Sequence, residues 1–125
     1  MTNPPAYTRG LNELIRAHRI YIGLSRDGMA AQLGMSGRTY DRIENGDRDC
    51  PPGFIDSVDD VVSRYEQAVN EFVQKAEKDG PMEVTVSSDP RQEWHRSVVG
   101  RAAVESQLIK PVLVAMDTTL FSRSG

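Results

Sequence analysis

Residues 19–46 constrain the fold more than any other part of this sequence. They read RIYIGLSRDGMAAQLGMSGRTYDRIENG, and each of the two serines is followed by a short stretch with helical spacing of apolar residues. Ser25 and Ser36 are suited to helix N-caps, because a serine hydroxyl accepts a hydrogen bond from a free amide of the first turn. Gly34 can adopt the left-handed backbone that a tight turn needs. The segment therefore predicts two short helices joined by a tight turn, the second ending at Asn45-Gly46.

Further helices are expected on both sides of this pair. Residues 11–22 place apolar side chains and His18 along one side, which predicts a helix that stops at Gly23. After a loop at residues 47–52, apolar residues recur in steps of three and four for about five turns, from Phe54 to Val73. This spacing predicts a single long helix over residues 53–78.

The order helix, tight turn, helix is that of a helix-turn-helix unit, whose second helix enters the DNA major groove. The two helices cross closely, so their contact positions must be small or apolar, and these positions hold Met29, Ala30, Leu33, Met35, Tyr40 and Ile43. The outer face of the second helix then holds Gly37, Arg38, Asp41 and Arg42. Arginine matches guanine O6 and N7, and aspartate accepts from cytosine N4. We therefore predict that these four residues contact DNA bases.

Residues 11–52 resemble the Xre/Cro/phage-repressor family of helix-turn-helix proteins. The matching landmarks are Arg19, Gly23-Leu24-Ser25, Met29-Ala30, Leu33-Gly34, Ser36, Thr39, Ile43-Glu44-Asn45-Gly46 and Pro51. The resemblance implies that Arg19 pairs with Glu44. It also implies a set of residues that contact phosphates or flanking bases: Arg26, Ser36, Thr39, Asn45 and Arg48, with Asp47 beside them in the loop.

Three departures from the family pattern matter. Gly37 replaces a longer side chain that often contacts bases, which leaves more of the readout to Arg38 and Arg42. Tyr40 replaces a smaller aliphatic residue, so we expect its hydroxyl to reach the DNA surface and add a flanking contact. The single long helix replaces the family's usual short ones, which puts the usual dimer geometry in doubt.

The C-terminal half predicts a small strand-helix-strand unit. Residues 82–86 alternate as a strand, 91–108 are helical in pattern, and 109–116 are apolar and β-branched despite Pro111. A unit of about 35 residues is too short for an independent core, so the long helix or a second copy must cover it. The segment Glu93-Trp94-His95-Arg96-Ser97-Val98 gives the whole chain a weaker resemblance to dimeric repressors encoded beside phage anti-CRISPR genes. The expected dimer interface is formed by Val61, Tyr65, Phe72, Trp94 and Val98.

The expected architecture is thus mainly α. We predict an N-terminal arm (1–8), a helix-turn-helix DNA-binding domain (9–52), the long helix (53–78), a C-terminal dimerisation unit (79–117) and a tail (118–125). Charge fits this division, because residues 1–50 carry seven arginines and six acids, whereas residues 51–80 carry three basic and seven acidic groups. The net charge of -3 therefore comes from the middle segment, away from the expected DNA contacts.

The sequence predicts a homodimeric, sequence-specific transcriptional repressor of phage or mobile-element type that binds double-stranded DNA at a short palindrome. The alternative is an antitoxin or other interaction module whose C-terminal half binds a partner protein. We expect no enzyme activity, because no nucleophile-base pair or phosphate loop is evident, and no cofactor. The sequence has one cysteine, Cys50, and no Cys/His cluster with zinc spacing. We therefore expect no metal site, and we expect the protein to work in the reducing cytoplasm. No apolar run is long enough for a membrane span, and we expect no secretory signal, because residues 1–10 contain no apolar h-region.

Overall fold

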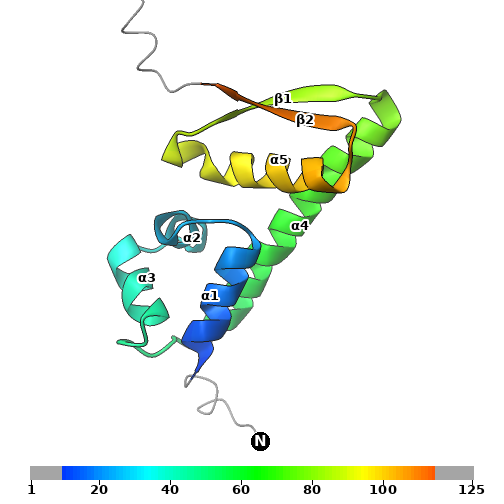
Figure 1. Cartoon of the computed structure of the whole chain (residues 1–125). Coiled ribbons are helices and arrows are strands. Elements are labelled where there is room, and N and C mark those ends of the chain that lie inside the picture. Colours follow the sequence, from blue (N-terminus) through cyan, green and yellow to red (C-terminus); the bar gives the residue numbers. More distant parts are fainter. Residues whose placement is uncertain (1–9, 115–125) are drawn as a thin grey trace, which may run out of the picture. The chain divides into compact units, whose positions relative to one another are not determined.

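The computed structural model describes residues 10–114, so the predicted arm (1–8) and tail (118–125) lie outside the described residues. The chain is mainly helical, with a helix-turn-helix arrangement near its start and a two-stranded sheet with a helix near its end, which confirms the predicted fold class (Figure 1). The elements in chain order are α1 (Leu11–Tyr21), α2 (Arg26–Leu33), α3 (Gly37–Glu44), α4 (Phe54–Asp79), β1 (Met82–Ser87), the 3-10 turn η2 (Pro90–Gln92), α5 (Glu93–Glu105) and β2 (Ile109–Val114).

The chain divides into two compact units, and the boundary lies inside α4, between Tyr65 and Glu66. We call the described residues 10–65 the N-terminal unit and the described residues 66–114 the C-terminal unit. The long helix, which we predicted as a segment of its own over residues 53–78, is therefore shared between the two units.

The N-terminal unit forms as the local sequence signals predict. Ser25 accepts a hydrogen bond from the Gly28 amide at 3.0 Å and caps α2, and Ser36 accepts one from the Thr39 amide at 3.1 Å and caps α3. Gly34 ends α2 with a φ of 73°, a left-handed conformation that costs glycine little. The buried apolar side chains of this unit come from all four helices, the turn between α1 and α2, and the loop before α4: Ile15, Ile22, Leu24, Met29, Ala30, Tyr40, Ile43, Cys50, Phe54, Val58, Val61 and Tyr65.

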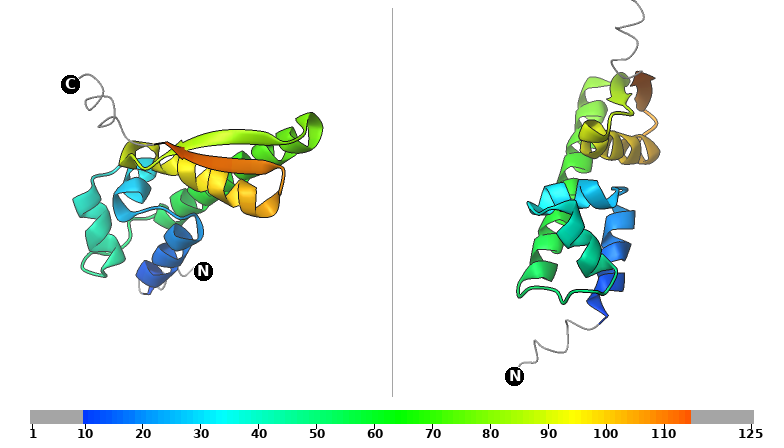
Figure 2. Two further views of the ribbon diagram at one scale, coloured as in Figure 1. Left: turned by 45° about the horizontal axis from the view of Figure 1, so that its top comes forward. Right: turned by 90° about the vertical axis from the view of Figure 1, so that its left-hand side faces the viewer.

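The C-terminal unit joins two parallel strands through a helix. β1 and β2 pair in register from Met82 with Ile109 to Ser87 with Val114, and α5 lies along one face of this sheet (Figures 1 and 2). The second half of α4 takes part in the same unit, where the Phe72 ring packs edge-on against His95. The buried side chains are Val69, Ala76, Val86, Val98, Val99, Ala102 and Ile109.

The helix that we predicted over residues 91–108 is shorter and has an irregular start. Asp89 accepts a hydrogen bond from the Arg91 amide at 2.9 Å, and this contact caps the 3-10 turn η2 before α5 begins at Glu93. The helix ends at Glu105 because Ser106 is extended, and the Ile109 amide then donates to the Ser106 carbonyl at 3.2 Å. The second strand ends at Val114 within the described residues, while the rest of its predicted range lies outside them.

The register of the sheet explains how β2 accommodates Pro111. The Met82 amide donates to the Leu108 carbonyl at 2.8 Å, which fixes which residues of β2 turn their backbone groups toward β1. By this alternation the backbone amide and carbonyl of Val112, and those of Lys110, point toward β1. The backbone groups of Ile109 and Pro111 point away from it. The backbone nitrogen of Pro111, which carries no hydrogen, therefore points to the outer edge of the sheet. No hydrogen bond between β1 and β2 is lost there.

The predicted dimer interface requires correction. Val61, Tyr65 and Val98 are each at most 3% exposed within one chain, because Val61 and Tyr65 belong to the core of the N-terminal unit and Val98 to the core of the C-terminal unit. Phe72 and Trp94 are half-buried. A second copy of the chain cannot contact the first three side chains without opening these cores.

Candidate nucleic-acid interface

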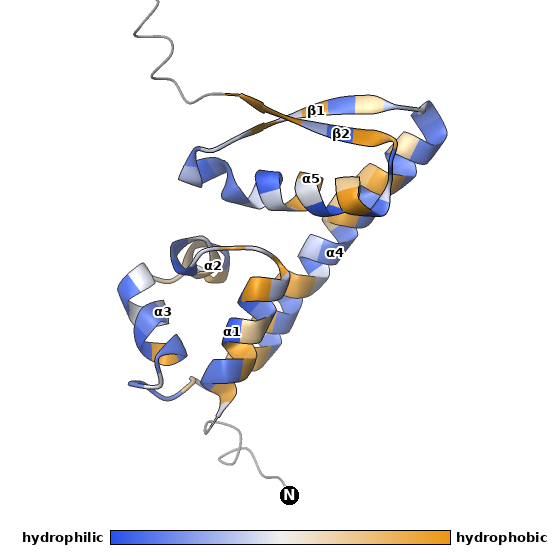
Figure 3. Cartoon of the chain, viewed as in Figure 1, coloured by the Kyte–Doolittle hydropathy of each residue, from blue (hydrophilic) through white to orange (hydrophobic). Residues whose placement is uncertain are grey.

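The outer face of α3 presents two arginines without a partner. Arg38 and Arg42 lie four residues apart and are exposed, and neither side chain forms a hydrogen bond or ion pair within residues 10–114. The residues of α3 are predominantly hydrophilic, with an apolar stretch of the ribbon near its C-terminal end (Figure 3). Four-residue spacing places both guanidinium groups on one side of the helix, where they can bind one ligand surface together.

Arg19 and Glu44 meet, as the family resemblance implied. The Arg19 Nε donates to Glu44 Oε2 at 2.9 Å and its Nη2 donates to Oε1 at 2.8 Å, so the pair is bidentate. The remaining Nη1 donates to the Leu24 carbonyl at 3.0 Å. The Arg19 side chain thus links α1 both to the end of α3, at Glu44, and to the turn before α2, at Leu24.

The expectation that the Tyr40 hydroxyl reaches DNA is wrong. Tyr40 is 0% exposed, and its hydroxyl donates to Glu44 Oε2 one helical turn later. Burial, followed by the hydrogen bond to the Glu44 carboxylate, raises the pKa of Tyr40 above its usual range. The ring therefore lies in the interior of the N-terminal unit.

Glu44 is a buried carboxylate with several donors around it. Burial alone would raise its pKa, but the hydrogen bonds from Arg19 and Tyr40 and the charges of Arg19 and Arg26 outweigh burial and lower it. Arg26, the first residue of α2, places its Nε 3.3 Å from Glu44 Oε1 and its Nη1 3.7 Å from Asp41 Oδ1. This orientation differs from that expected of an arginine free to bind phosphate.

Gly37 has a packing role next to α2. A Cβ built on Gly37 would lie 2.4 Å from Asp27 Oδ1, so any side chain there requires the Asp27 carboxylate to move. Glycine at the start of α3 thus gives room to an acid in the first turn of α2. Its predicted contact to a base stays a prediction.

Comparison with known families gives a match across this region. Residues 11–72 match the model of a family described as a helix-turn-helix domain. The chain contains a helix-turn-helix domain. No curated protein matches the chain. The matched range ends at Phe72, so it includes residues 54–72 of α4, the long helix that departs from the expected short ones, and leaves out its last turns up to Asp79.

The remaining predicted contacts of the helix-turn-helix domain lie at the two ends of α3. Ser36 and Thr39 are joined by their hydroxyls at 3.0 Å in addition to the cap, and both stay candidates for phosphate contact. At the other end Asn45 and Arg48 are exposed in the loop after α3. Their predicted phosphate contacts are consistent with this exposure and remain predictions.

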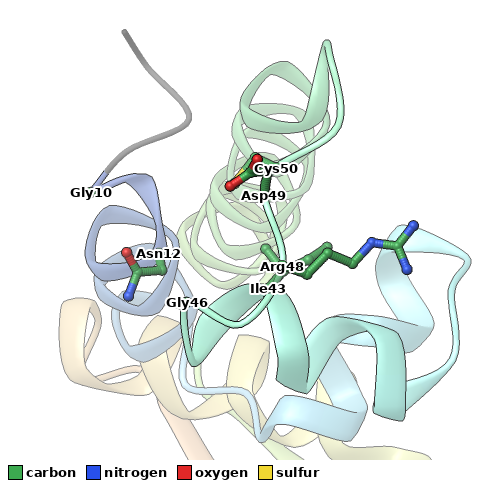
Figure 4. Close-up of a pocket in the computed structure, with 7 residues that line it drawn as sticks. All are labelled: Gly10, Asn12, Ile43, Gly46, Arg48, Asp49 and Cys50. Atoms are coloured by element: carbon green, nitrogen blue, oxygen red, sulfur yellow. The ribbon is translucent and has the colours of Figure 1, made fainter. Parts of the chain in front are cut away.

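A shallow pocket of about 330 Å³ lies beside this loop, lined by Gly10, Asn12, Ile43, Gly46, Arg48, Asp49 and Cys50. In Figure 4 the Arg48 side chain extends away from Asn12, so the polar groups of the pocket do not converge on one point. Asn12 instead donates to the Glu44 carbonyl at 3.3 Å, and burial raises the pKa of the Cys50 thiol. The polar side chain of Asn12 in this pocket therefore links α1 to the end of α3. The pocket offers no evident ligand site.

Sequence reasoning missed that Arg26 and Tyr40 are partners of Glu44. The spacing of Tyr40 and Glu44 gave a usable signal, because residues four apart on a helix face the same side. The Arg26 contact crosses between two helices, and no local pattern encodes it. Within residues 10–114 no cluster of metal-binding side chains occurs, and none of the helices described there could cross a membrane.

Proposed function

We propose that this protein is a sequence-specific transcriptional repressor of phage or mobile-element type, related to Xre and Cro proteins, that acts in the cytoplasm as a homodimer. The carrying observation is the pair Arg38 and Arg42, which lie exposed and unpartnered within the described residues on one face of α3. Because α3 is the second helix of the helix-turn-helix pair, it is the element that enters the major groove. Both arginines then meet the edges of bases, where each can bind guanine.

A homodimer supports this function by doubling the base contacts. Its two α3 helices would read the half-sites of a palindrome about 34–36 Å apart. Since three of the five residues first expected at the interface, Val61, Tyr65 and Val98, are buried, we assign self-association to apolar side chains that the C-terminal unit exposes. These are Val104, 84% exposed on α5, and Leu113 and Val114 at the end of β2.

The test of DNA binding begins with selection of bound duplexes from random DNA. Fluorescence anisotropy with the most enriched duplex then compares the protein with Arg38→Ala and Arg42→Ala. Each loss should weaken binding by about 1–3 kcal/mol per half-site and relax preference at one base pair. Arg96→Ala removes an exposed arginine of the C-terminal unit and should leave affinity unchanged. If selection enriches no sequence, the repressor function is rejected in favour of the alternative, a module that binds a partner protein.

The test of self-association is light scattering at micromolar concentration. We expect a dimer for the protein and a monomer for the double variant Val104→Asp and Leu113→Asp. A dimer that persists in the folded double variant would place the interface elsewhere.

A further inference from the structure

Arg26 faces two carboxylates of α3 that lie three residues apart. Its Nε is 3.3 Å from Glu44 Oε1, and its Nη1 is 3.7 Å from Asp41 Oδ1. The guanidinium therefore spans from the interior of the helix-turn-helix domain to the outer face of α3. A side chain held in this way is poorly placed to follow a phosphate strand.

The burial of the two carboxylates differs. The Glu44 side chain is 0% exposed, whereas that of Asp41 is 44% exposed. Asp41 Oδ1 is nevertheless buried, and it accepts no hydrogen bond within residues 10–114. The exposed area of Asp41 must therefore lie on its other atoms. Asp41 turns one oxygen toward Arg26 and leaves the rest of the carboxylate accessible.

The charges of this cluster balance. Arg19 already forms two hydrogen bonds with Glu44, and Tyr40 donates a third, so Glu44 is compensated before Arg26 is counted. The positive charge of Arg26 is then left to offset Asp41. This offset matters at a DNA surface, because an uncompensated carboxylate is repelled by the phosphates.

Asp41 also shares its side of α3 with the proposed base-reading arginines. It lies three residues after Arg38 and directly before Arg42, which places all three within about one third of the helix circumference. An acceptor in the major groove is suited to the exocyclic amine of cytosine, which no arginine can recognise.

We propose that Asp41 reads a cytosine through its accessible oxygen, and that Arg26 is a positioning residue that holds the Asp41 carboxylate in place. This inference rests on the proposed function. It assigns to Arg26 a part in sequence preference that a phosphate contact would not have. A lost phosphate contact weakens all sequences similarly and flattens the salt dependence. A lost positioning contact changes preference at the base pair that Asp41 reads.

The experiment uses the most enriched duplex and its single-base-pair variants, measured by fluorescence anisotropy at two salt concentrations. Asp41→Ala should lower the preference for cytosine at one base pair by about 10-fold. Arg26→Ala should lower preference at the same base pair, and the double variant should lose no more than the larger single loss, because the two residues act as one unit. Arg48→Ala, a proposed phosphate contact, should weaken every duplex by a similar factor.

Folding of each variant is checked by circular dichroism, since Arg26 also contacts Glu44. Asp41→Ala keeps the inference testable if Arg26→Ala unfolds, because Asp41 is half exposed and contributes no core packing. A uniform loss in Arg26→Ala with a smaller salt slope would assign Arg26 to phosphate and overturn the inference. Unchanged preference in folded Asp41→Ala would overturn it as well. In either case an enriched duplex that still depends on Arg38 and Arg42 would leave the proposed function standing.

Discussion

The two units of the chain use charged side chains in different ways. In the N-terminal unit a fully buried carboxylate, Glu44, is surrounded by Arg19, Arg26 and Tyr40. In the C-terminal unit the pairs Lys75 with Asp79 and Arg101 with Glu105 lie at the surface, and the buried side chains given above for this unit are all apolar.

This difference indicates that charged side chains contribute more to the stability of the N-terminal unit than to that of the C-terminal unit. A surface pair is screened by water and contributes little, whereas removal of one partner of a buried pair leaves the other charge uncompensated. The interior charges of the N-terminal unit also lie directly beneath the outer face of α3. The same side chains that fix the helices therefore fix the residues proposed to bind DNA.

The largest expected effect comes from Glu44→Ala. It leaves Arg19 and Tyr40 without their acceptor in the interior, so we expect the free energy of unfolding to fall by about 2–4 kcal/mol. Urea denaturation followed by circular dichroism measures the change. The matched control, Glu13→Ala, removes an exposed acid of α1 and should cost a few tenths of a kcal/mol. Equal midpoints for the two variants would show that the buried Glu44 carboxylate contributes no more to stability than an exposed acid of the same unit.

A loss from the apolar core of the C-terminal unit should be somewhat smaller. Val99 is 0% exposed, and Val99→Ala removes two methyl groups and leaves a small cavity, which we expect to cost about 1.5–3 kcal/mol. Hydrogen exchange should show the loss of protection in β1 and β2. Arg96→Ala, at an exposed position of the same helix, should leave protection unchanged. Equal losses in both variants would indicate that Val99 is not a core residue.

Acidification should destabilise the N-terminal unit through Glu44. Because the folded-state pKa of Glu44 is lowered, its contribution is present above the unfolded pKa of about 4.3 and is lost as pH falls through the folded value. The difference in unfolding free energy between the protein and Glu44→Gln should therefore shrink below about pH 4. A difference that is constant from neutral to acid pH would contradict the lowered pKa.

The smallest effect is expected for the surface pair of α5. Arg101 Nε donates to Glu105 Oε2 at 2.9 Å, and both side chains are at least 36% exposed. Glu105→Ala should lower the unfolding free energy by about 0.3–0.5 kcal/mol, and added salt should reduce even this. A loss near that of Glu44→Ala, measured in the same urea titration, would show that charge is structural in both units.

Local signals predicted the N-terminal unit well. The serine caps and Gly34 gave α2 and α3 to within a residue, because a cap and a left-handed glycine act within four residues of chain. The exposed arginines followed from the same helical spacing. The DNA contacts themselves remain predictions.

Features that depend on distant residues were harder to predict. The depth of Tyr40 depends on how closely α1 and α3 pack, and the wide apolar stripe of α4 gave no sign of whether one chain or two would cover it. The structure shows that Val61 and Tyr65 are covered by the chain itself. Likewise, alternation predicted both strands but not their parallel pairing, which joins residues 27 positions apart, as in Met82 with Ile109.

The placement of Pro111 limits how far the sheet can grow. On the outer edge of β2 the Ile109 amide is already bonded to Ser106, and Pro111 has no amide to offer, so an incoming strand finds few donors there. Within the described residues the β1 edge, which holds no proline, is therefore better suited to strand addition than the β2 edge. A fibril grows only if each molecule pairs at both edges of its sheet. If two chains pair through their β1 edges, the shared sheet has a strand containing Pro111 at each outer edge, which disfavours further growth.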